Sequence, residues 1–366
     1  MQKTIVLLIV LFLSISCNRE SSIFMWEKSM GEGNSFFVNE SPDSGIVAGG
    51  ELNHKPFIVE FDRNRSLLYT VSYPGNGVFS SGWGDTSGYI AAGSTEGKML
   101  IARFGRTGRP IWDTTFATSS HISFSRLVYE GGGILLAAGT ANPDSTSSGM
   151  AGLLFVRFDT TGNIITKKEV TDDWFTAAGN IAEDGSGNIY IPVTNRSNSS
   201  RPRAAIAKFS PDLNLTWQTD LYNNSSYSSS ATSVFLDGSY IYVTGRTEMA
   251  EQEGTVDNSF IAALNASGLL AWKKYMEIYN AGSRFRINDE GTMMLMNRNC
   301  FLINLLSNFG SDSAPDISGL LRLFDGCDSK NTDAAGNDFY IDHEGNITAC
   351  GSLGGNFYIS VKSASQ

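Results

Sequence analysis

Short runs of alternating hydrophobic and polar residues recur along the chain, and each run ends on a large apolar residue. The runs are PFIVEF, MLIARF, LLFVRF, AAIAKF and SFIAAL. In the most regular copies a glycine follows the last apolar residue after four positions, and a tryptophan follows after four more, as in Phe104, Gly108 and Trp112. A period of two is typical of β-strands, and turn-forming residues fill the gap before the tryptophan. The pattern therefore predicts a strand, a tight turn and a second strand.

A further strand precedes each of these hairpins and usually ends near glycine, as in GIVAGG, GYIAAG, ILLAAG, YIYVTG and NITACG. Another apolar stretch comes before it, which makes four strands in each repeat. The final apolar residues, which we call anchors, recur seven times over 300 residues with a mean repeat of 50 residues: Phe61, Phe104, Phe158, Phe209, Leu264, Leu306 and Val361.

Seven four-stranded units of this length predict an all-β fold, a seven-bladed β-propeller covering residues 23–366. A single four-stranded blade cannot bury both of its faces, whereas blades packed around an axis bury them and protect most strand edges. A β-solenoid would have shorter repeats, and a β-sandwich would not keep one motif through the chain.

The two ends of the chain complement each other. The last repeat stops soon after its anchor Val361, without its tryptophan strand, while IFMWEKSM near the N-terminus matches LLAWKKYM of the fifth repeat. We therefore expect the N-terminal strand to complete the last blade and close the ring. This arrangement predicts that Trp26 is buried against blade one or blade six.

The first residues have the pattern of a secretory signal peptide, predicted over residues 1–16. Lys3 is followed by the apolar stretch from Ile5 to Leu13, which is too short for a comfortable membrane span. Ser14 and Ser16 precede Cys17, as in a bacterial lipoprotein signal with a relaxed lipobox. We expect lipid attachment at Cys17, with residues 17–22 as the tether; the alternative is cleavage there with an unmodified thiol.

Composition restricts the chemistry that can be expected. The 366 residues carry a formal net charge of −10 and only three histidines, which disfavours nucleic-acid binding and most metal or acid–base sites. No phosphate-binding loop or catalytic triad pattern is present, so we expect no cofactor and no metal. Of Cys300, Cys327 and Cys350, a bridge from Cys327 to either of the others is an option, and buried thiols are the alternative.

The segment YVTGRT…DNSFIAALNASGLLAWKKYM resembles the bacterial β-propeller repeat known as SBBP. The resemblance extends from Gly45 to Gln366, together with the N-terminal strand. A weaker similarity links the anchor–Gly–Trp element to PQQ-type propeller repeats, from which this chain departs by its long loops and by lacking a Lys after the turn glycine. Proteins with SBBP repeats are typically exported, so the resemblance implies a location and a shape rather than a reaction.

Three consecutive blades have long loops between their second and third strands, at 140–151, 195–203 and 246–258. Such loops and the links between blades emerge on one face, where aromatic and charged residues provide a recognition surface. The candidate binding face comprises Trp174, Tyr222, Tyr227, Tyr279, Arg196, Arg201, Arg203, Glu251 and Glu253. The basic loop at 196–203 and the acidic loop at 248–257 are expected to pair; plain variable loops are the alternative interpretation.

These observations predict a monomeric binding module held at the bacterial cell envelope by its lipid, in the outer membrane or at the cell surface. The expected ligand is a protein or a glycan, not a nucleic acid. One alternative is an accessory lipoprotein of outer-membrane assembly. Another is a polysaccharide-acting enzyme, which would need at least two acids on the innermost strands at one end; the predicted first strands contain almost none.

Overall fold

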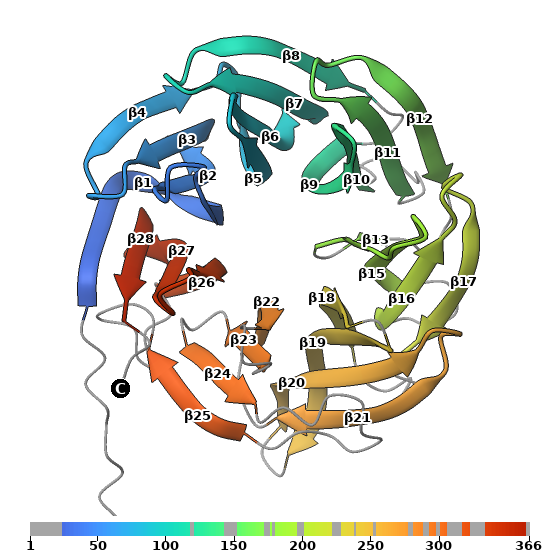
Figure 1. The fold of residues 1–366 in the computed structure, drawn as a ribbon. Helices are drawn as coiled ribbons and strands as arrows, with labels where there is room; N and C mark the ends of the chain where they lie inside the picture. Colours follow the sequence, from blue (N-terminus) through green and yellow to red (C-terminus); the bar gives the residue numbers. More distant parts are fainter. Residues whose placement is uncertain are drawn as a thin grey trace, which may run out of the picture.

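The structure, a computed structural model, describes residues 24–117, 121–142, 152–171, 176–177, 180–195, 201–221, 228–237, 239–251, 254–276, 281–287, 293–297, 301–305, 317–322 and 334–363. The regular secondary structure in these ranges is β-strand throughout, in sheets arranged around a central axis (Figure 1). This arrangement is a β-propeller, which confirms the predicted all-β propeller class.

Neighbouring strands are antiparallel, and most sheets follow the chain order from the axis outward. The first sheet after the N-terminal region contains β5 (Gly77–Asp85), β6 (Gly88–Thr95), β7 (Lys98–Gly105) and β8 (Pro110–Phe116). The next contains β9 (His121–Gly131), β10 (Ile134–Asn142), β11 (Gly152–Asp159) and β12 (Ile164–Thr171). The third contains β13 (Thr176–Ala177), β14 (Ala182–Glu183), β15 (Ile189–Asn195), β16 (Arg203–Phe209) and β17 (Leu215–Asp220).

Two further four-stranded sheets continue around the ring. One contains β18 (Ser229–Leu236), β19 (Tyr240–Glu251), β20 (Gly254–Asn265) and β21 (Leu270–Met276). The other contains β22 (Ala281–Ile287), β23 (Met293–Asn297), β24 (Phe301–Leu305) and β25 (Ile317–Arg322). The predicted sixth anchor, Leu306, lies outside the described residues.

The chain ends meet in a seven-stranded sheet, ordered β26-β27-β28-β1-β2-β3-β4. Its strands are β26 (Ala334–Ile341), β27 (Ile347–Leu353), β28 (Asn356–Lys362), β1 (Phe24–Glu40), β2 (Ile46–Leu52), β3 (Lys55–Phe61) and β4 (Leu67–Ser72). The early part of β1 pairs with β28, with Trp26 opposite Val361, and its later part pairs with β2.

One strand therefore does what the sequence pattern assigns to two, the outer strand around Trp26 and the innermost strand SFFVN. The change of partner falls between Glu32, which still pairs with Asn356 of β28, and Gly33, which pairs with β2. The register with β28 shifts just before this point, between Ser29 and Glu32. Gly31 has a φ of 113° there, a left-handed conformation that side chains rarely adopt. Glycine at this point lets the strand leave one sheet and enter the next without ending.

The core lies between adjacent sheets. The six anchors among the described residues are at most 1% exposed, and the buried clusters join residues of neighbouring sheets, such as Ile101 with Leu154. Trp112 on β8 packs edge-on against the anchor Phe158 of the next sheet, with ring centroids 6.0 Å apart. Trp26 packs in the same way on Phe61, at 5.0 Å. The predicted packing of Trp26 against blade one is thus confirmed, although its ring is half-buried.

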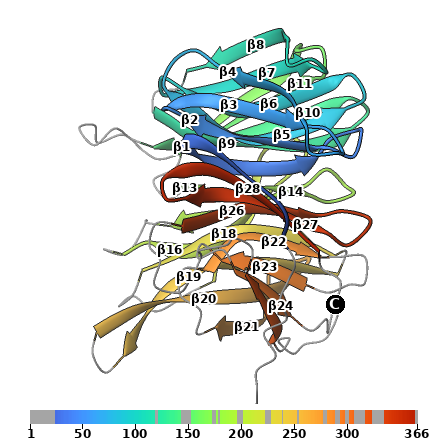
Figure 2. The same ribbon diagram turned by 90° about the vertical axis from the view of Figure 1, so that its left-hand side faces the viewer.

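The prediction of a third long loop, at 246–258, is wrong. The structure extends β19 and β20 as a paired hairpin, from Arg246 opposite Ser259 out to Glu251 opposite Gly254. Thr, Val and Met in this segment sustain strand pairing, so the insertion lengthens two strands instead of leaving the sheet. Figure 2 shows this hairpin reaching beyond the other sheets.

Candidate functional site

A cavity of about 360 Å³ opens at the axis, between the innermost strands of several sheets. Its lining comes from β1, β5, β9, the segment 180–183 and β18. Figure 1 shows β5, β9 and β18 around the central axis. The polar lining residues are Asn39, Ser81, Arg126, Asn180 and Glu183, and the apolar ones include Phe37, Leu127, Ile181, Val234 and Phe235. A volume in this range suits a small polar ligand or one group of a larger partner.

The innermost strands share a β-bulge close to the axis. The register shifts between Ser35 and Phe37 on β1, between Phe79 and Ser81 on β5, and between Ala231 and Ser233 on β18. A bulge inserts one extra residue and turns the following side chains. The bulges therefore determine which side chains of these strands face the axis.

Asparagine side chains at the cavity bind the main chain of a neighbouring sheet. Asn180 accepts a hydrogen bond from the Val234 amide at 2.8 Å and donates one to the Val234 carbonyl at 3.0 Å. Asn39 donates to the Gly82 carbonyl at 3.0 Å and to the Tyr89 hydroxyl. These contacts fix both amide side chains, so the lining is preorganised rather than free to collapse.

The side of the cavity formed by β5 and β9 is held in the same way. Arg126 is almost fully buried and donates from Nη1 to the Ser80 carbonyl. The Ser81 hydroxyl accepts a hydrogen bond from the Leu127 amide at 3.1 Å. A guanidinium held at the wall of the cavity gives it one fixed positive charge.

Glu183 supplies the opposite charge at the cavity. Burial raises its pKa, and repulsion from Glu130 adds to the effect, while Arg157 acts against it. Glu130 is itself bound by Arg157 through two hydrogen bonds of 2.6 and 2.7 Å. The lining thus combines one cation and one carboxylate, which gives no net preference for a charged ligand.

Another acid, Asp338, lies on the innermost strand β26, which was not among the predicted first strands. It is fully buried and is not part of the cavity lining. Its carboxylate accepts hydrogen bonds from the amides of Val38 at 3.3 Å and Phe339 at 2.9 Å. Asp338 therefore ties β26 to β1, and its role is structural.

The cavity and the candidate binding face are built on different parts of the sheets. Some cavity residues, such as Asn39 and Leu236, are close to the ends of innermost strands that lead into the second strands, and others, such as Ser81 and Arg126, lie in the middle of theirs. The predicted face is built on turns between second and third strands, which lie at the other end of each sheet because its strands are antiparallel.

At the predicted face, a small hollow of about 110 Å³ is lined by Pro202, Ser228, Ser229, Ser230, Arg246 and Glu248. Arg201 forms an ion pair with Glu248, with Nη1 and Oε2 3.1 Å apart, and Glu248 also accepts a hydrogen bond from the Ser228 amide at 3.2 Å. The predicted pairing of the basic and acidic loops is confirmed at this contact. Both side chains are partly exposed, so the pair adds little stability.

Only part of the candidate binding face can be placed. Arg203 lies at the start of β16, 4.0 Å from Asp220, and Glu251 ends β19. The remaining predicted residues lie outside the described residues: Trp174, Arg196, Tyr222, Tyr227, Glu253, Tyr279 and the lipid site Cys17. Cys300 and Cys327 also lie outside them, while Cys350 is buried in the core.

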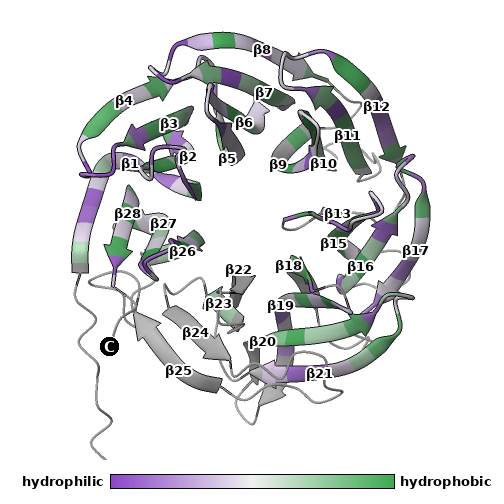
Figure 3. Cartoon of the chain, viewed as in Figure 1, coloured by the Kyte–Doolittle hydropathy of each residue, from purple (hydrophilic) through white to green (hydrophobic). Residues whose placement is uncertain are grey.

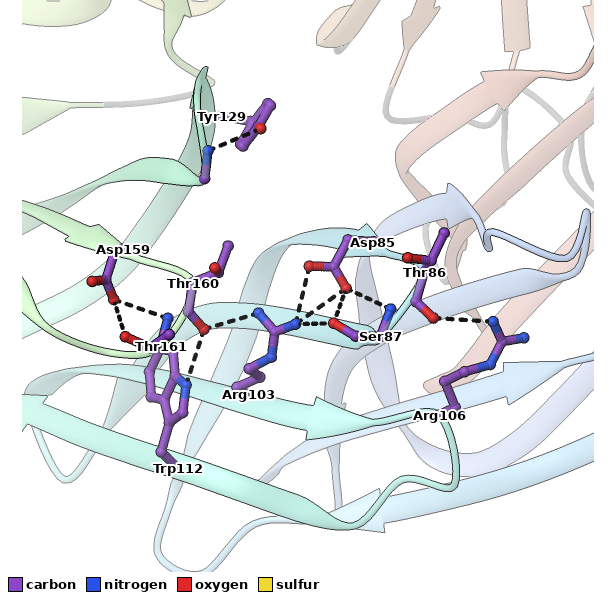
Figure 4. A network of polar contacts seen from close by, with 11 residues as sticks. Asp85, Thr86, Ser87, Arg103, Arg106, Trp112, Tyr129, Asp159, Thr160 and Thr161 are labelled. Atoms are coloured by element: carbon purple, nitrogen blue, oxygen red, sulfur yellow. Dashed lines mark hydrogen bonds and ion pairs between the residues drawn. The ribbon is translucent and has the colours of Figure 1, made fainter.

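Sequence reasoning missed a set of cations between sheets (Figure 4). Arg103 donates to both oxygens of Asp85, at 3.0 and 3.1 Å, and to the Thr160 carbonyl of the next sheet at 3.0 Å. Trp112 donates from Nε1 to the same carbonyl at 3.3 Å. Arg157 repeats the arrangement with Glu130 and with the Pro211 carbonyl at 3.0 Å. The signal was a basic residue directly before the anchor, visible in MLIARF, LLFVRF and AAIAKF.

The carboxylate of Asp85 is held in its ionised form. Burial raises the pKa of Asp85, but hydrogen bonds from Ser87 and Arg103 outweigh this effect and lower it. Hydrogen bonding to Glu130 raises the pKa of Arg157. The described residues contain no group of three or more His, Cys, Asp or Glu arranged to hold a metal ion. Within the same part of the chain, no helix has the length and apolar character needed to cross a membrane.

Comparison of the sequence with protein-family models and with curated proteins finds no match. Solved structures do resemble the fold. The Neurospora crassa Pan2 WD40 domain is 12% identical, covers 93% of this chain and 96% of its own, and gives a TM-score of 0.59. The β-propeller domain of Myceliophteria thermophila Cps50 (Swd1) is also 12% identical, covers 94% and 100%, and gives 0.60.

A third similar structure is Drosophila Plexin A in complex with Semaphorin 1b, at 7% identity, 94% and 88% coverage and a TM-score of 0.58. At these identities the likeness concerns the fold alone. Together the three structures support the β-propeller fold.

Proposed function

We propose that this chain is an exported, lipid-anchored β-propeller of seven blades that binds a neutral, polar ligand, a glycan, in its axial cavity. The seven blades are the five separate sheets and the two halves of the seven-stranded sheet, with β1 as the outer strand of the last blade and the innermost strand of the first. The pairing of β1 with β28 supports ring closure at this joint.

The observation that carries the ligand proposal is the fixed polar lining of the cavity. Asn39, Asn180 and Arg126 are held by main-chain groups, so they meet a ligand without losing further side-chain freedom. The single cation is balanced by Glu183, which favours a ligand without net charge. Amide and guanidinium groups next to Phe235 suit a sugar, which combines hydroxyl groups with apolar ring faces.

The anchoring part of the proposal rests on the sequence. The apolar stretch before Cys17 supports export, and the SBBP-like repeat supports a place in the cell envelope, at the outer membrane or the cell surface. The proposal assigns binding rather than catalysis to the cavity. Incubation with the bound glycan should therefore release no new reducing ends.

The test is a glycan array of neutral and acidic oligosaccharides, probed with the purified mature protein and with Leu127→Trp, which places a large side chain in the cavity. The matched control is Leu215→Trp, because Leu215 is 40% exposed on the outer strand β17. Binding of neutral glycans that Leu127→Trp weakens at least tenfold and Leu215→Trp leaves unchanged would support the proposal. Binding that survives Leu127→Trp, or a protein partner captured instead of any glycan, would overturn it.

A further inference from the structure

The outer wall of the ring carries exposed apolar side chains at a second set of β-bulges. On each outermost strand the register shifts just after the strand begins, at Leu68 on β4, Ile111 on β8 and Ile165 on β12. Met25 is the equivalent bulge residue on β1, where this strand pairs with β28. These four side chains are 51–57% exposed. A bulge turns a side chain that would otherwise follow the pleat, and here it presents an apolar one to the outside.

The four strands are neighbours around the ring: β1, β4, β8 and β12 follow one another along its rim (Figure 1). Figure 3 shows hydrophobic residues on the outer strands β4, β8 and β12. The equivalent bulge residues on β17 and β21 are small, Thr216 and Ala271, although Leu215 and Leu270 beside them are 40% and 44% exposed. The large bulge residues thus form one continuous arc.

Arginine accompanies this arc in the turns before two of its strands. The turn before β4 contains Arg63 and Arg65, and the turn before β8 contains Arg106 and Arg109. Arg106 is paired with Asp43, while Arg63 and Arg109 are exposed. The turns before β12, β17 and β21 contain no basic residue. In a chain with a net charge of −10, this combination of arginine and large apolar residues is local to β4 and β8.

The proposed lipid site is close in sequence to the same arc. Met25 follows Cys17 by eight residues, and eight extended residues reach at most about 28 Å. A lipid on Cys17 would therefore keep this side of the ring close to the membrane surface. Exposed apolar side chains flanked by arginine are what proteins use to rest in the headgroup region of anionic membranes.

We infer that the outer wall formed by β1, β4 and β8 rests on an anionic lipid bilayer, with Met25, Leu68 and Ile111 in the headgroup region and Arg63 and Arg109 on the phosphates. This inference rests on the proposed lipid anchor but is independent of the glycan. The contact orients the ring with its axis along the membrane surface, which leaves both ends of the channel open.

The first experiment uses the full lipidated chain in native envelope vesicles supplied with a photoactivatable phospholipid. Crosslinks on β4 and β8, in addition to the tether, are expected. Crosslinks confined to the tether would overturn the inference and leave the anchor intact. Absence of any crosslink would overturn both the inference and the proposed anchoring, while the glycan array would still report on the cavity.

The second experiment measures flotation of the mature chain from residue 18, without the lipid, on vesicles of phosphatidylcholine with or without 30% phosphatidylglycerol. Every described strand lies within residues 24–363 and pairs within this range, so this chain contains the whole described fold. We expect binding to the anionic vesicles only, reduced about tenfold by Leu68→Glu with Ile111→Glu and about fivefold by Arg63→Gln with Arg109→Gln. The matched control Leu270→Glu, on β21, should change nothing.

Equal loss of binding in Leu270→Glu would overturn the assignment of the contact to this arc. So would concentration-dependent dimerisation that Leu68→Glu abolishes, because the arc would then be an interface between two copies of the chain. Unchanged circular dichroism of the variants verifies that the exposed substitutions leave the fold intact.

Discussion

Two junctions, one between neighbouring sheets and one between the two halves of the seven-stranded sheet, solve the same packing problem with different chemistry. Between β5–β8 and β9–β12 the chain is continuous, and Arg103 binds Asp85 in its own sheet and the Thr160 carbonyl in the next. Where the chain ends meet, Ser360 takes the place before the anchor, and aromatic rings fill the junction: Trp26 against Phe61, and Phe57 against Phe357 at 5.5 Å.

The difference shows how the repeat tolerates variation. The anchor is an apolar residue in every copy, but the residue before it can be an arginine, a lysine, a glutamate, an alanine, a leucine or a serine. A cation is useful only where a carboxylate stands at the end of the first strand and a carbonyl of the next sheet faces it. At the joint of the chain ends, the strand pairing of β1 with β28 already links the two halves of the seven-stranded sheet, and apolar packing completes the contact.

Among the variants that test this comparison, Arg157→Ala is expected to lower the free energy of unfolding most. Glu130 is only 8% exposed in its side chain, so removing its partner leaves a buried carboxylate uncompensated and should lower the free energy of unfolding by about 3 kcal/mol. Arg103→Ala should cost less, about 1–2 kcal/mol, because Asp85 is 27% exposed and water can replace the arginine. Urea unfolding of the two variants measures both values, and an equal loss would contradict the role given to burial.

Trp26→Ala tests the aromatic junction. The ring is half-buried against Phe61, so the loss of packing should lower the free energy of unfolding by about 2–3 kcal/mol, less than for a fully buried tryptophan. A double-mutant cycle with Phe61→Leu should give a coupling of about 1 kcal/mol. A coupling near zero, or an unchanged melting temperature after deletion of residues 23–30, would show that the N-terminal strand does not hold this joint.

Gly162→Ala tests the contact between a turn and the tryptophan of the preceding sheet. Gly162 has a φ of 93°, and a Cβ there would meet Trp112 at 3.0 Å, so strain and a clash should together cost about 2 kcal/mol. Gly345→Ala is the matched control: its φ is 81°, but a Cβ would meet nothing within 4 Å, and the expected cost is about 1 kcal/mol. Equal melting temperatures for the two variants would mean that the Trp112 side chain moves away from the added Cβ at no cost in stability.

Much of this architecture could be predicted from the sequence, because anchors such as Phe104 and Phe158 recur at a regular spacing and are buried for the same reason in each copy. The bulges of the innermost strands could not be predicted in this way. The extra residue at each bulge, such as Ser80 or Thr232, is small and polar and does not stand out in the hydrophobic pattern. The cavity lining depends on which innermost strands face one another across the axis. Asn39 and Asn180 are 141 positions apart in the sequence, and no local pattern links them.

The smallest effect on stability is expected in the turn after β11. This turn tests hydrogen bonds within one turn, separately from the contacts between sheets. Hydrogen bonds from the side chains of Thr161 and Asn163 lower the pKa of Asp159 to about 2 from an ordinary value of 3.8. Because the pKa is lower in the folded protein, the contribution of Asp159 to stability is present above pH 4 and is lost as the pH falls through about 2. A carboxyl titration followed by NMR should give a midpoint near 2 in the wild type, and Asn163→Ala should raise it toward 3.8. A wild-type midpoint already near 3.8 would mean that the carboxylate of Asp159 does not hold this exposed turn. That result would not contradict the roles of Arg103 and Arg157, because their carboxylate partners are more buried.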